Sequence, residues 1–418
     1  MIDDSKPNAN ASYINKLNKI KVINLIRSSK GISRADIAKK TRLSPPTVSR
    51  IVEDLIEEEL VVEVGEGESK GGRRPTLLEF SGGNHYIIGI DLGTTNIYGV
   101  LTDLNAQIIA EKKVPTNVKL GFHKVMERTA KVIQDLEELL SKKKQKRIYG
   151  IGMAVAGLIN RQRMIVEFSP DFHWHEVDVV GELRKWYDFP IVFDNVTRVM
   201  ALGELCYGVG RNYKNFICVN VGYGIGAGIV VDGKPLYGFK GMAGEFGHIT
   251  LDKESSIQCD CGNFGCLEAL SSGNAIAKAA QREVQKGVST MLREMSEGNV
   301  EAITAEMVAK AAKQGDALAW GVFETAMEYL GIGIAALINL FNPEIVVIGG
   351  GVTQAGDILF DKVRKVVKAR ALNKVAQEVE IVPATFGMKA AAMGAVSLIL
   401  NRVLTFDLIH PSSSDYLH

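Results

Sequence analysis

The chain has 418 residues, of which 46% are hydrophobic, and its 49 basic and 48 acidic side chains leave a formal net charge of +1. This length exceeds what one core usually serves, so we expect two or three domains in an ordinary α/β protein. A polar N-terminus and the lack of any long apolar run argue against a signal peptide and a membrane span. Five cysteines, three of them within eight positions, fit a reducing cytoplasm better than an oxidising compartment.

Charge is distributed unevenly near the N-terminus. Between Lys16 and Arg50 there are ten basic residues and one acid, whereas between Glu53 and Glu68 there are eight acids and no base. Because the whole chain is close to neutral, this asymmetry concentrates positive charge on one small segment.

The first predicted elements are three short helices. We expect helix one over residues 15–28, a second helix over 34–40 capped by Ser33, and a third helix that begins at Pro45 and is capped by Ser44. One face of the third helix is apolar at helical spacing, through Val48, Ile51, Val52, Leu55 and Ile56. The opposite face offers Thr47, Ser49 and Arg50 near the N-terminal end, the part of a recognition helix that enters the major groove.

A basic loop follows these helices between two predicted strands, residues 60–64 and 76–80. It places three basic residues beside glycines and a proline, namely Lys70, Arg73 and Arg74. Guanidinium groups on a slim, extended loop suit the negative potential of a narrow A·T minor groove. Residues 1–80 are therefore predicted to form a winged helix-turn-helix that binds DNA. The alternative is a small three-helix protein-interaction domain with a solvated basic face.

Two similar units occur after the linker at residues 81–83. The first opens with a strand and a glycine-containing turn within residues 86–96, followed by strands over 100–102 and 107–113; the second has a strand over 216–220, a glycine-rich loop over 221–228 and a strand ending at Val231. Repetition of a strand, a glycine-rich turn and a second strand predicts two similar lobes around a cleft, each a mixed sheet covered by helices. We assign residues 81–197 with 386–418 to the first lobe and 198–385 to the second, with further helices over 124–140, 198–207 and 388–403.

A cluster of metal-binding residue types lies in the second lobe. Three thiolates and one imidazole, from His248, Cys259, Cys261 and Cys266, satisfy the tetrahedral demand of Zn²⁺. Gly262 and Gly265 allow the tight loop that such convergence needs. Because all four positions are filled by protein ligands, a structural zinc ion is favoured over a catalytic one. The alternative is three buried free cysteines beside an unrelated histidine.

The segment from Gly244-Glu245-Phe246-Gly247-His248 to Cys259-Asp260-Cys261-Gly262-Asn263-Phe264-Gly265-Cys266-Leu267-Glu268 resembles the signature of the ROK family of sugar kinases and sugar-responsive repressors. The resemblance runs from about residue 87 to about residue 400. It implies an α/β, actin-like ATPase (ribonuclease H-like) two-lobed fold, and the N-terminal winged helix-turn-helix is typical of the repressor branch.

The resemblance also implies a sugar site. In the family, the matching residues bind sugar hydroxyls, which here are Asn195, Glu245, His248 and Glu268, with Gly157 allowing close backbone approach. In its kinases, glycine-rich turns hold ATP, and the turn at 348–351 resembles the adenosine-side turn. Tyr223 stands where those kinases usually carry a small threonine, which puts the grip on phosphate in question.

One departure from the kinases bears directly on catalysis. The resemblance aligns Asn195 with their conserved asparagine and Val196 with the aspartate that deprotonates the sugar hydroxyl. Valine cannot accept a proton, and general-base catalysis contributes about 10²–10⁴-fold, so no kinase activity is expected. Asp194 is expected to point elsewhere. A shift of register that restores an aspartate to this position is the alternative.

These observations predict a cytoplasmic, sugar-responsive transcriptional repressor. It would bind double-stranded operator DNA as a homodimer or higher homo-oligomer, carry a structural Zn²⁺ ion, and respond to a monosaccharide or sugar phosphate. A sugar kinase with an appended regulatory domain is the second reading. A repressor whose effector is a transporter protein is the third.

Overall fold

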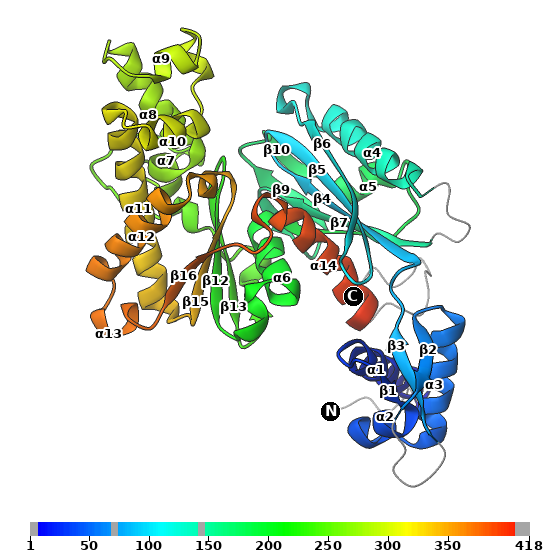
Figure 1. Cartoon of the computed structure of the whole chain (residues 1–418). Helices are drawn as coiled ribbons and strands as arrows, with labels where there is room; N and C mark the ends of the chain where they lie inside the picture. Colours follow the sequence, from blue (N-terminus) through cyan, green and yellow to red (C-terminus); the bar gives the residue numbers. More distant parts are fainter. Residues whose placement is uncertain (1–6, 68–73, 141–146, 406–418) are drawn as a thin grey trace.

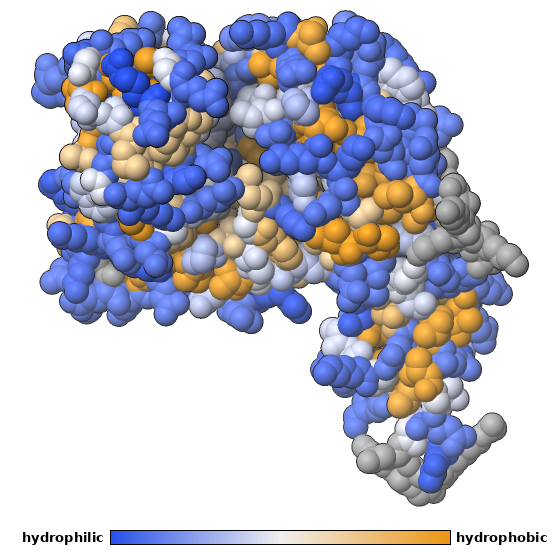
Figure 2. All heavy atoms as spheres, turned by 45° about the horizontal axis from the view of Figure 1, so that its top comes forward, coloured by the Kyte–Doolittle hydropathy of each residue, from blue (hydrophilic) through white to orange (hydrophobic). Residues whose placement is uncertain are grey.

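The structure is a computed structural model, and it describes residues 7–67, 74–140 and 147–405. A small N-terminal domain projects from a larger body made of two lobes (Figures 1 and 2). Each lobe is built on a five-stranded mixed sheet, and the two sheets are separated by a pair of helices, α6 and α14.

The N-terminal domain consists of three helices and a small sheet. Its helices are α1 (Pro7–Arg27), α2 (Arg34–Thr41) and α3 (Pro45–Glu57), and its strands are β1 (Ile32–Ser33), β2 (Val61–Glu66) and β3 (Thr76–Phe80) in the order β1-β3-β2. The predicted caps are confirmed, because the Ser33 hydroxyl accepts the Asp36 N–H and the Ser44 hydroxyl accepts the Thr47 N–H. The first helix begins well before residue 15, and strand β1 was not anticipated.

The first lobe contains the sheet β11-β7-β4-β5-β6. Its strands are β4 (His85–Leu92), β5 (Asn96–Asp103), β6 (Ile108–Pro115), β7 (Arg147–Val155) and β11 (Ile191–Asn195). Strands β4, β5 and β6 pair antiparallel, whereas β7 and β11 extend the sheet in parallel with β4. Helices α4 (Phe122–Glu138) and α5 (Val179–Leu183) and a small sheet of β8 (Leu158–Asn160), β9 (Ile165–Ser169) and β10 (Trp174–Val177) complete the lobe.

The second lobe repeats this topology, so the predicted duplication is confirmed. Its sheet has the order β14-β13-β12-β15-β16, from β12 (Phe216–Val221), β13 (Ile225–Val231), β14 (Lys234–Pro235), β15 (Ile345–Gly349) and β16 (Glu380–Pro383). Strands β12, β13 and β14 are antiparallel, and β15 and β16 are parallel to β12.

The predicted loop over 221–228 is wrong in its second half, where strand β13 already begins at Ile225. Gly226 and Gly228 are strand residues at a close helix contact. A Cβ on Gly228 would lie 2.3 Å from the Thr197 carbonyl oxygen of α6. Glycine inside a strand often marks such a close approach, and the sequence pattern does not distinguish it from a turn.

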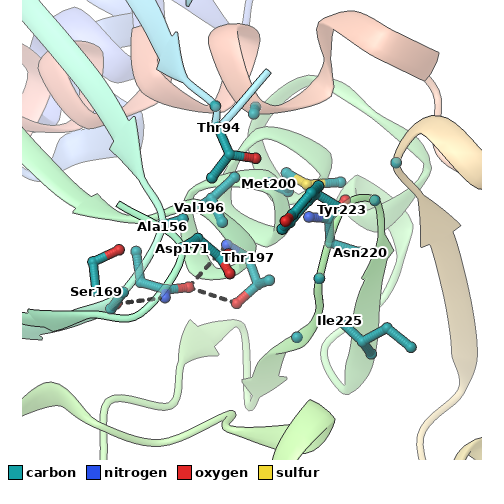
Figure 3. Close-up of a pocket in the computed structure, with 18 of the residues that line it drawn as sticks. Thr94, Ala156, Ser169, Asp171, Val196, Thr197, Met200, Asn220, Tyr223 and Ile225 are labelled. Atoms are coloured by element: carbon teal, nitrogen blue, oxygen red, sulfur yellow. Dashed lines mark hydrogen bonds between the residues drawn. The ribbon is translucent and has the colours of Figure 1, made fainter. Parts of the chain in front are cut away.

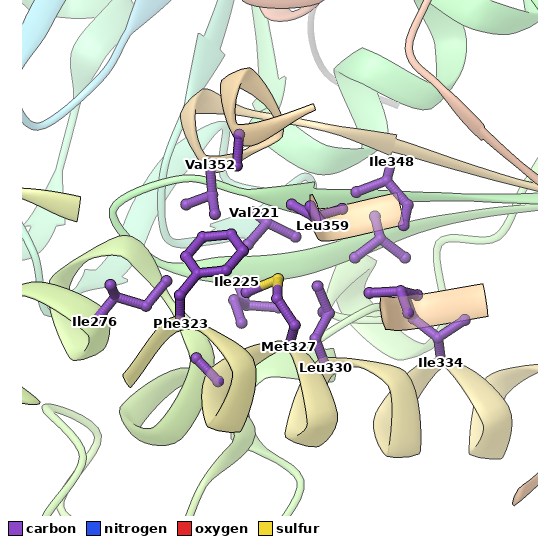
Figure 4. Close-up of a cluster of buried hydrophobic side chains, with 14 of the residues drawn as sticks. Val221, Ile225, Ile276, Phe323, Met327, Leu330, Ile334, Ile348, Val352 and Leu359 are labelled. Carbon is purple, nitrogen blue, oxygen red and sulfur yellow. The ribbon is translucent and has the colours of Figure 1, made fainter. Parts of the chain in front are cut away.

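Helices cover the outer face of the second sheet. They are α7 (Leu267–Ser271), α8 (Gly273–Gln285), α9 (Leu292–Met295), α10 (Ala305–Lys313), α11 (Ala317–Phe341), α12 (Asp357–Arg370) and α13 (Asn373–Ala376). Helix α11 is long and apolar enough to cross a membrane, but 56% of its most apolar window is buried inside the lobe. Phe323, Met327 and Leu330 of α11 pack against the sheet in one hydrophobic core (Figure 4). Burial against a sheet explains why this helix is apolar on most sides.

Helices α6 (Val196–Tyr207) and α14 (Ala390–Thr405) form the contact between the lobes. They cross where Gly203 meets Gly394, and a Cβ on Gly394 would lie 2.0 Å from the Val199 carbonyl oxygen. Helix α14 also packs on β4 and β7, where a Cβ on Gly152 would lie 1.8 Å from the Ala395 carbonyl oxygen. The C-terminal helix therefore lies against the first sheet while contacting α6.

The N-terminal domain packs on the same helix pair. Val22, Ile23 and Ile26 of α1 share a hydrophobic cluster with apolar residues of α14, including Met393 and Val396. Arg27 at the end of α1 donates a hydrogen bond of 3.0 Å to the Tyr207 hydroxyl at the end of α6, and its guanidinium lies 5.6 Å from the centre of the tyrosine ring. The small domain is thus joined to the body by both apolar and polar contacts.

Candidate functional site

A cleft of about 390 Å³ lies between the two lobes. It is lined by the β4–β5 turn, the end of β7, the β9–β10 turn, the start of α6, the β12–β13 turn and the segment around residue 245. Thr94 and Val196 of the first lobe and Tyr223 of the second line it (Figure 3). Its volume lies within the usual range of small-molecule pockets, about 300–1,000 Å³.

All five residues predicted to contact a sugar line this one cleft. They come from four segments of the chain and are Gly157, Asn195, Glu245 with His248, and Glu268. Their spatial convergence agrees with a shared role, and their contact with a sugar stays a prediction.

Asn195 and Gly157 are connected to each other. The Asn195 amide nitrogen donates to the Gly157 carbonyl at 2.9 Å, and the Asn195 amide oxygen accepts the Thr197 N–H at 2.9 Å as the cap of α6. Gly157 has φ of +126°, and a Cβ there would lie 2.6 Å from the Phe168 carbonyl oxygen. Asn195 therefore fixes the start of α6 as well as facing the cleft.

The two glutamates of the cleft are partly shielded from water. Burial raises the pKa of the Glu245 carboxyl, and it raises the pKa of Glu268 likewise. Glu268 accepts the backbone N–H of Ile225 at 2.8 Å, so its carboxylate is tied to the β12–β13 turn. Such groups are suited to accept hydrogen bonds from hydroxyl groups within an enclosed site.

Two further aspartates line the cleft that sequence reasoning did not select. Burial raises the pKa of Asp91 to about 7. Burial and the neighbouring Glu268 and Asp260 carboxylates raise the pKa of Asp171 to about 6. Asp91 ends the first glycine-containing strand, a pattern that could have marked it. Asp171 sits in the β9–β10 turn, where no motif or periodicity in the sequence points to it.

The start of α6 holds Val196 in the cleft lining and directs Asp194 elsewhere. The Asp194 carboxylate is 5% exposed and accepts two hydrogen bonds from Arg198, at 2.7 and 3.1 Å. It does not belong to the cleft lining. The charge of Asp194 is thus balanced within the protein, and valine is the residue that α6 presents at its first position.

His248, Cys259, Cys261 and Cys266 form a compact cluster whose ligand atoms all lie within 4.8 Å of one another. The Cys259 sulfur lies 3.6 Å from His248 Nδ1, and the Cys261 and Cys266 sulfurs are 3.8 Å apart. Metal–sulfur bonds of about 2.3 Å in a tetrahedron place two sulfurs nearly 3.8 Å apart. Burial raises the pKa of Cys259 and Cys266, so a cation is needed to keep them as thiolates. The cluster could hold a metal ion.

Local backbone geometry explains how the four ligands of this segment converge. Gly262 and Gly265 both have positive φ, at +96° and +65°, and a Cβ on Gly265 would lie 1.8 Å from the Asp252 carbonyl oxygen. The Cys259 N–H donates to the Asn263 carbonyl at 2.8 Å, which closes the loop between the cysteines. His248 belongs both to this cluster and to the cleft lining.

The candidate nucleic-acid interface is the outer face of α3. Arg50 is exposed there, and Thr47 and Ser49 are partly exposed. Arg50 donates to Asn15 of α1 at 3.0 Å, so its guanidinium is held across the helix pair. The basic segment between Lys16 and Arg50 offers less unpaired positive charge than its composition indicates. Lys19 is buried and pairs with Glu58 at 2.7 Å.

The wing is described only in part. Lys70 and Arg73 lie outside the described residues. Arg74 is 67% exposed at the foot of the wing and lies 4.0 Å from Glu66. The exposed guanidinium of Arg74 is available for contact with a DNA phosphate or a DNA groove.

Comparison with known families gives two matches. A profile described as the ROK family matches residues 87–402, and one described as winged helix-turn-helix DNA-binding matches residues 16–62. Together they span both the small domain and the two-lobed body.

Similar proteins include a repressor and a kinase. The xylose repressor of Caldicellulosiruptor bescii is 34% identical over 400 residues, covering 95% of this chain and 98% of its own length. A crystal structure of a ROK family transcriptional regulator, a homologue of the Escherichia coli MLC protein, matches with a TM-score of 0.79 and 30% identity over 94% of this chain and 97% of its own. A ROK family glucokinase from Streptomyces griseus, in complex with glucose and AMPPNP, matches with a TM-score of 0.69 and 28% identity over 75% of this chain and 98% of its own.

Proposed function

The chain belongs to the ROK family, and from that premise we propose that it is a cytoplasmic, sugar-responsive transcriptional repressor. The observation that carries the proposal is the union of a winged helix-turn-helix domain with a sugar-kinase-like body whose helix α6 begins with Val196. A valine there supplies no general base for phosphoryl transfer. The nearby Asp194 carboxylate forms an ion pair with Arg198 instead of facing the cleft. Binding without chemistry is what a sensor requires.

We assign the His/Cys₃ cluster to a structural Zn²⁺ ion. Its donor set of three sulfurs and one nitrogen suits zinc and leaves no open position for catalysis. Bound there, zinc supplies a cross-link between the segment that carries Glu245 and the loop of Cys259, Cys261 and Cys266. His248 would then be held by the metal while it also lines the cleft.

Helix α6 offers a direct route from the cleft to the DNA-binding domain. Its first residues line the cleft next to Asn195, and its last residue, Tyr207, accepts a hydrogen bond from Arg27 of α1. The helix has 12 residues, so at 1.5 Å per residue it is about 18 Å long. A ligand that changes the position of α6 at the cleft also changes the surface on which α1 rests.

DNA recognition is proposed to follow the usual division of winged helix-turn-helix domains. Thr47, Ser49 and Arg50 of α3 would contact base edges in the major groove, while Lys70, Arg73 and Arg74 of the wing would contact phosphates and the minor groove. Two copies of the chain would bind two half-sites of an operator as a homodimer, since dimers match the symmetry of palindromic sites.

The test is operator binding by the full chain. Fluorescence anisotropy with a DNA fragment that the chain itself selects from genomic DNA, against a scrambled fragment of equal length at the same salt, is expected to show specific binding at least ~10³-fold tighter. Addition of an effector sugar from a monosaccharide panel is expected to release the DNA. Equal affinity for both fragments would contradict the proposal.

A variant pair tests the route through α6. Tyr207→Phe removes the hydroxyl that accepts from Arg27 and is expected to keep DNA binding while reducing its response to sugar. Tyr187→Phe is the matched control, because its hydroxyl donates to the Ala130 carbonyl of α4 at 2.7 Å, within the first lobe and outside the cleft lining. Identical responses of both variants would exclude this route.

A further inference from the structure

We propose that residues 237–245 form a strap between the two lobes, clamped by two arginines, and that this clamp ties the cleft lining to helix α6. The strap leads from β14 to the turn at Phe246–His248, and its last residue, Glu245, lines the cleft. The inference rests on the proposed function, because it names the contacts through which a ligand in the cleft would move the helix that meets the N-terminal domain.

One aromatic ring of the strap contacts both arginines. The guanidinium carbon of Arg161, in the β8–β9 turn of the first lobe, lies 3.8 Å from the centre of the Tyr237 ring. The guanidinium carbon of Arg198, the third residue of α6, lies 5.9 Å from the same centre. A cation within about 6 Å of a ring centre is attracted by the electron-rich face of the ring, so Arg161 makes the stronger contact. Tyr237 thus links a segment of the second lobe to the first lobe and to α6.

A buried carboxylate orients the two guanidinium groups. Asp194, near the end of β11, accepts two hydrogen bonds from Arg198, at 2.7 and 3.1 Å. Its other oxygen lies 4.0 Å from Arg161 Nε. Because this anion belongs to the first sheet, it holds both arginines at the place where the Tyr237 ring meets them.

Arg198 also holds the backbone of the strap. Its Nη1 donates to the Ala243 carbonyl at 3.1 Å, two residues before Glu245. The Ala243 N–H donates to the Tyr237 carbonyl at 3.0 Å, which closes the strap into a loop. Burial raises the pKa of Glu245, and the charge of Arg198 is among those that oppose the rise. One guanidinium group therefore acts both on a carboxyl group of the cleft and on the first turn of α6.

Little hydrophobic packing fixes the middle of the strap. The Phe239 side chain is 85% exposed. The backbone turns through positive φ at Gly238, Lys240 and Gly241, with values of +67°, +56° and +84°. A Cβ on Gly241 would lie 3.0 Å from Arg161 Cγ, so the strap and the β8–β9 turn approach closely there. The clamp, more than a core, determines where the strap lies.

Hydrogen–deuterium exchange of the full chain, measured without sugar or DNA, tests the inference. Arg161→Met keeps the aliphatic stem and removes the cation, whereas Tyr237→Leu removes the ring. Each is expected to speed amide exchange in the strap by about threefold to tenfold. Exchange is expected to accelerate also in α6 and at the end of α1, because the clamp and the Arg27–Tyr207 bond form one series of contacts. Exchange in α11 is expected to stay unchanged, since this helix packs in the core of the second lobe.

Two matched variants serve as controls. Arg163→Met removes another arginine of the same turn, whose pairing with Glu176 is exposed to solvent, the two side chains being 58% and 62% exposed. Tyr237→Phe keeps the ring and with it the contact to the cations. Neither control is expected to change the exchange of the strap or of α6.

Three outcomes would overturn the inference. The first is strap exchange in Arg161→Met and Tyr237→Leu that equals that of the unaltered chain. The second is faster exchange in the strap alone, because the strap would then be a local contact without a connection to α6. The third is equal acceleration by Tyr237→Phe and Tyr237→Leu. Because the measurement uses neither operator nor sugar, its result is independent of the operator-binding test of the proposed function.

Discussion

The buried ion pair at the start of α6 provides a sharp test of how the cleft is held. Asp194→Asn removes the negative charge that faces Arg198, whose side chain is only 3% exposed. The Arg198 guanidinium would keep one further hydrogen bond, to the Ala243 carbonyl at 3.1 Å. Arg161, whose Nε lies 4.0 Å from the second Asp194 oxygen, is a weaker partner of the same carboxylate and offers Arg198 no replacement anion.

The expected cost follows from leaving one buried charge without its partner. Breaking such a pair typically destabilises a protein by ~3–5 kcal/mol, and asparagine can still accept a hydrogen bond, so we expect about 3 kcal/mol. For a lobe of this size, 1 kcal/mol corresponds to roughly 2–4 °C in Tm. The first thermal transition is therefore expected to fall by about 6–12 °C, as measured by differential scanning calorimetry at constant metal content.

Two further variants make the measurement decisive. Adding Arg198→Met to Asp194→Asn removes the unpaired charge and is expected to recover much of the lost Tm. Glu127→Gln breaks an exposed pair with Lys124 and is expected to cost less than about 1 kcal/mol. The reasoning from buried charge is wrong if Asp194→Asn lowers Tm no more than Glu127→Gln does. It is also wrong if the double variant has a lower Tm than Asp194→Asn alone.

Four other outcomes are expected. Cys261→Ala is expected to lose one bound zinc per chain by elemental mass spectrometry, along with the sugar response, whereas untreated protein without zinc would refute the assignment. The unaltered chain is expected to show no ATP-dependent sugar phosphorylation in a coupled assay, because Val196 cannot act as a base; robust turnover would contradict this. Arg50→Ala is expected to weaken operator binding by ~1–3 kcal/mol and relax base preference, as measured by anisotropy on substituted operators. Asp91→Asn is expected to raise Tm more at pH 8 than at pH 5. The pKa of Asp91 is about 7 in the folded chain, above the ordinary value of Asp, so the free energy of unfolding falls as pH rises from the ordinary pKa to the folded one. Asparagine removes this loss. A rise in Tm that is equal at pH 5 and pH 8 would exclude the explanation.

Local signals predicted much of the fold and of the metal cluster. A short window of sequence suffices to find the helix caps and the apolar face of α3, because each depends on residues of a single helix. The caps are Ser33 and Ser44. The Cys/His cluster is likewise marked by spacing within one segment. The repeated strand–turn–strand pattern predicted two lobes because each copy needs the same glycine-containing turn.

The parts that escaped prediction depend on contacts between distant segments. Gly228 resembles a turn residue in sequence, yet it pairs with Cys218 inside strand β13, and a glycine is needed there because α6 approaches its backbone. Asp171 enters the cleft because the β9–β10 turn forms part of its lining, and nothing in its neighbours along the chain encodes that position. The composition of the N-terminal segment overstates the positive charge available to DNA, since Lys19 is neutralised by Glu58 and the Arg27 side chain is directed to Tyr207 of the body.

The size of the coupling required by the proposed mechanism is modest. To weaken operator binding 100-fold, a sugar must favour the released arrangement by about 2.7 kcal/mol. A few buried polar contacts, each worth roughly 0.5–1.5 kcal/mol, cover that range. The Arg27–Tyr207 bond at one end of α6 and the Asn195 contacts at its other end are therefore of the right magnitude. By linkage, operator DNA must weaken sugar binding by the same factor, so the cleft of the DNA-bound protein is necessarily the poorer sugar site.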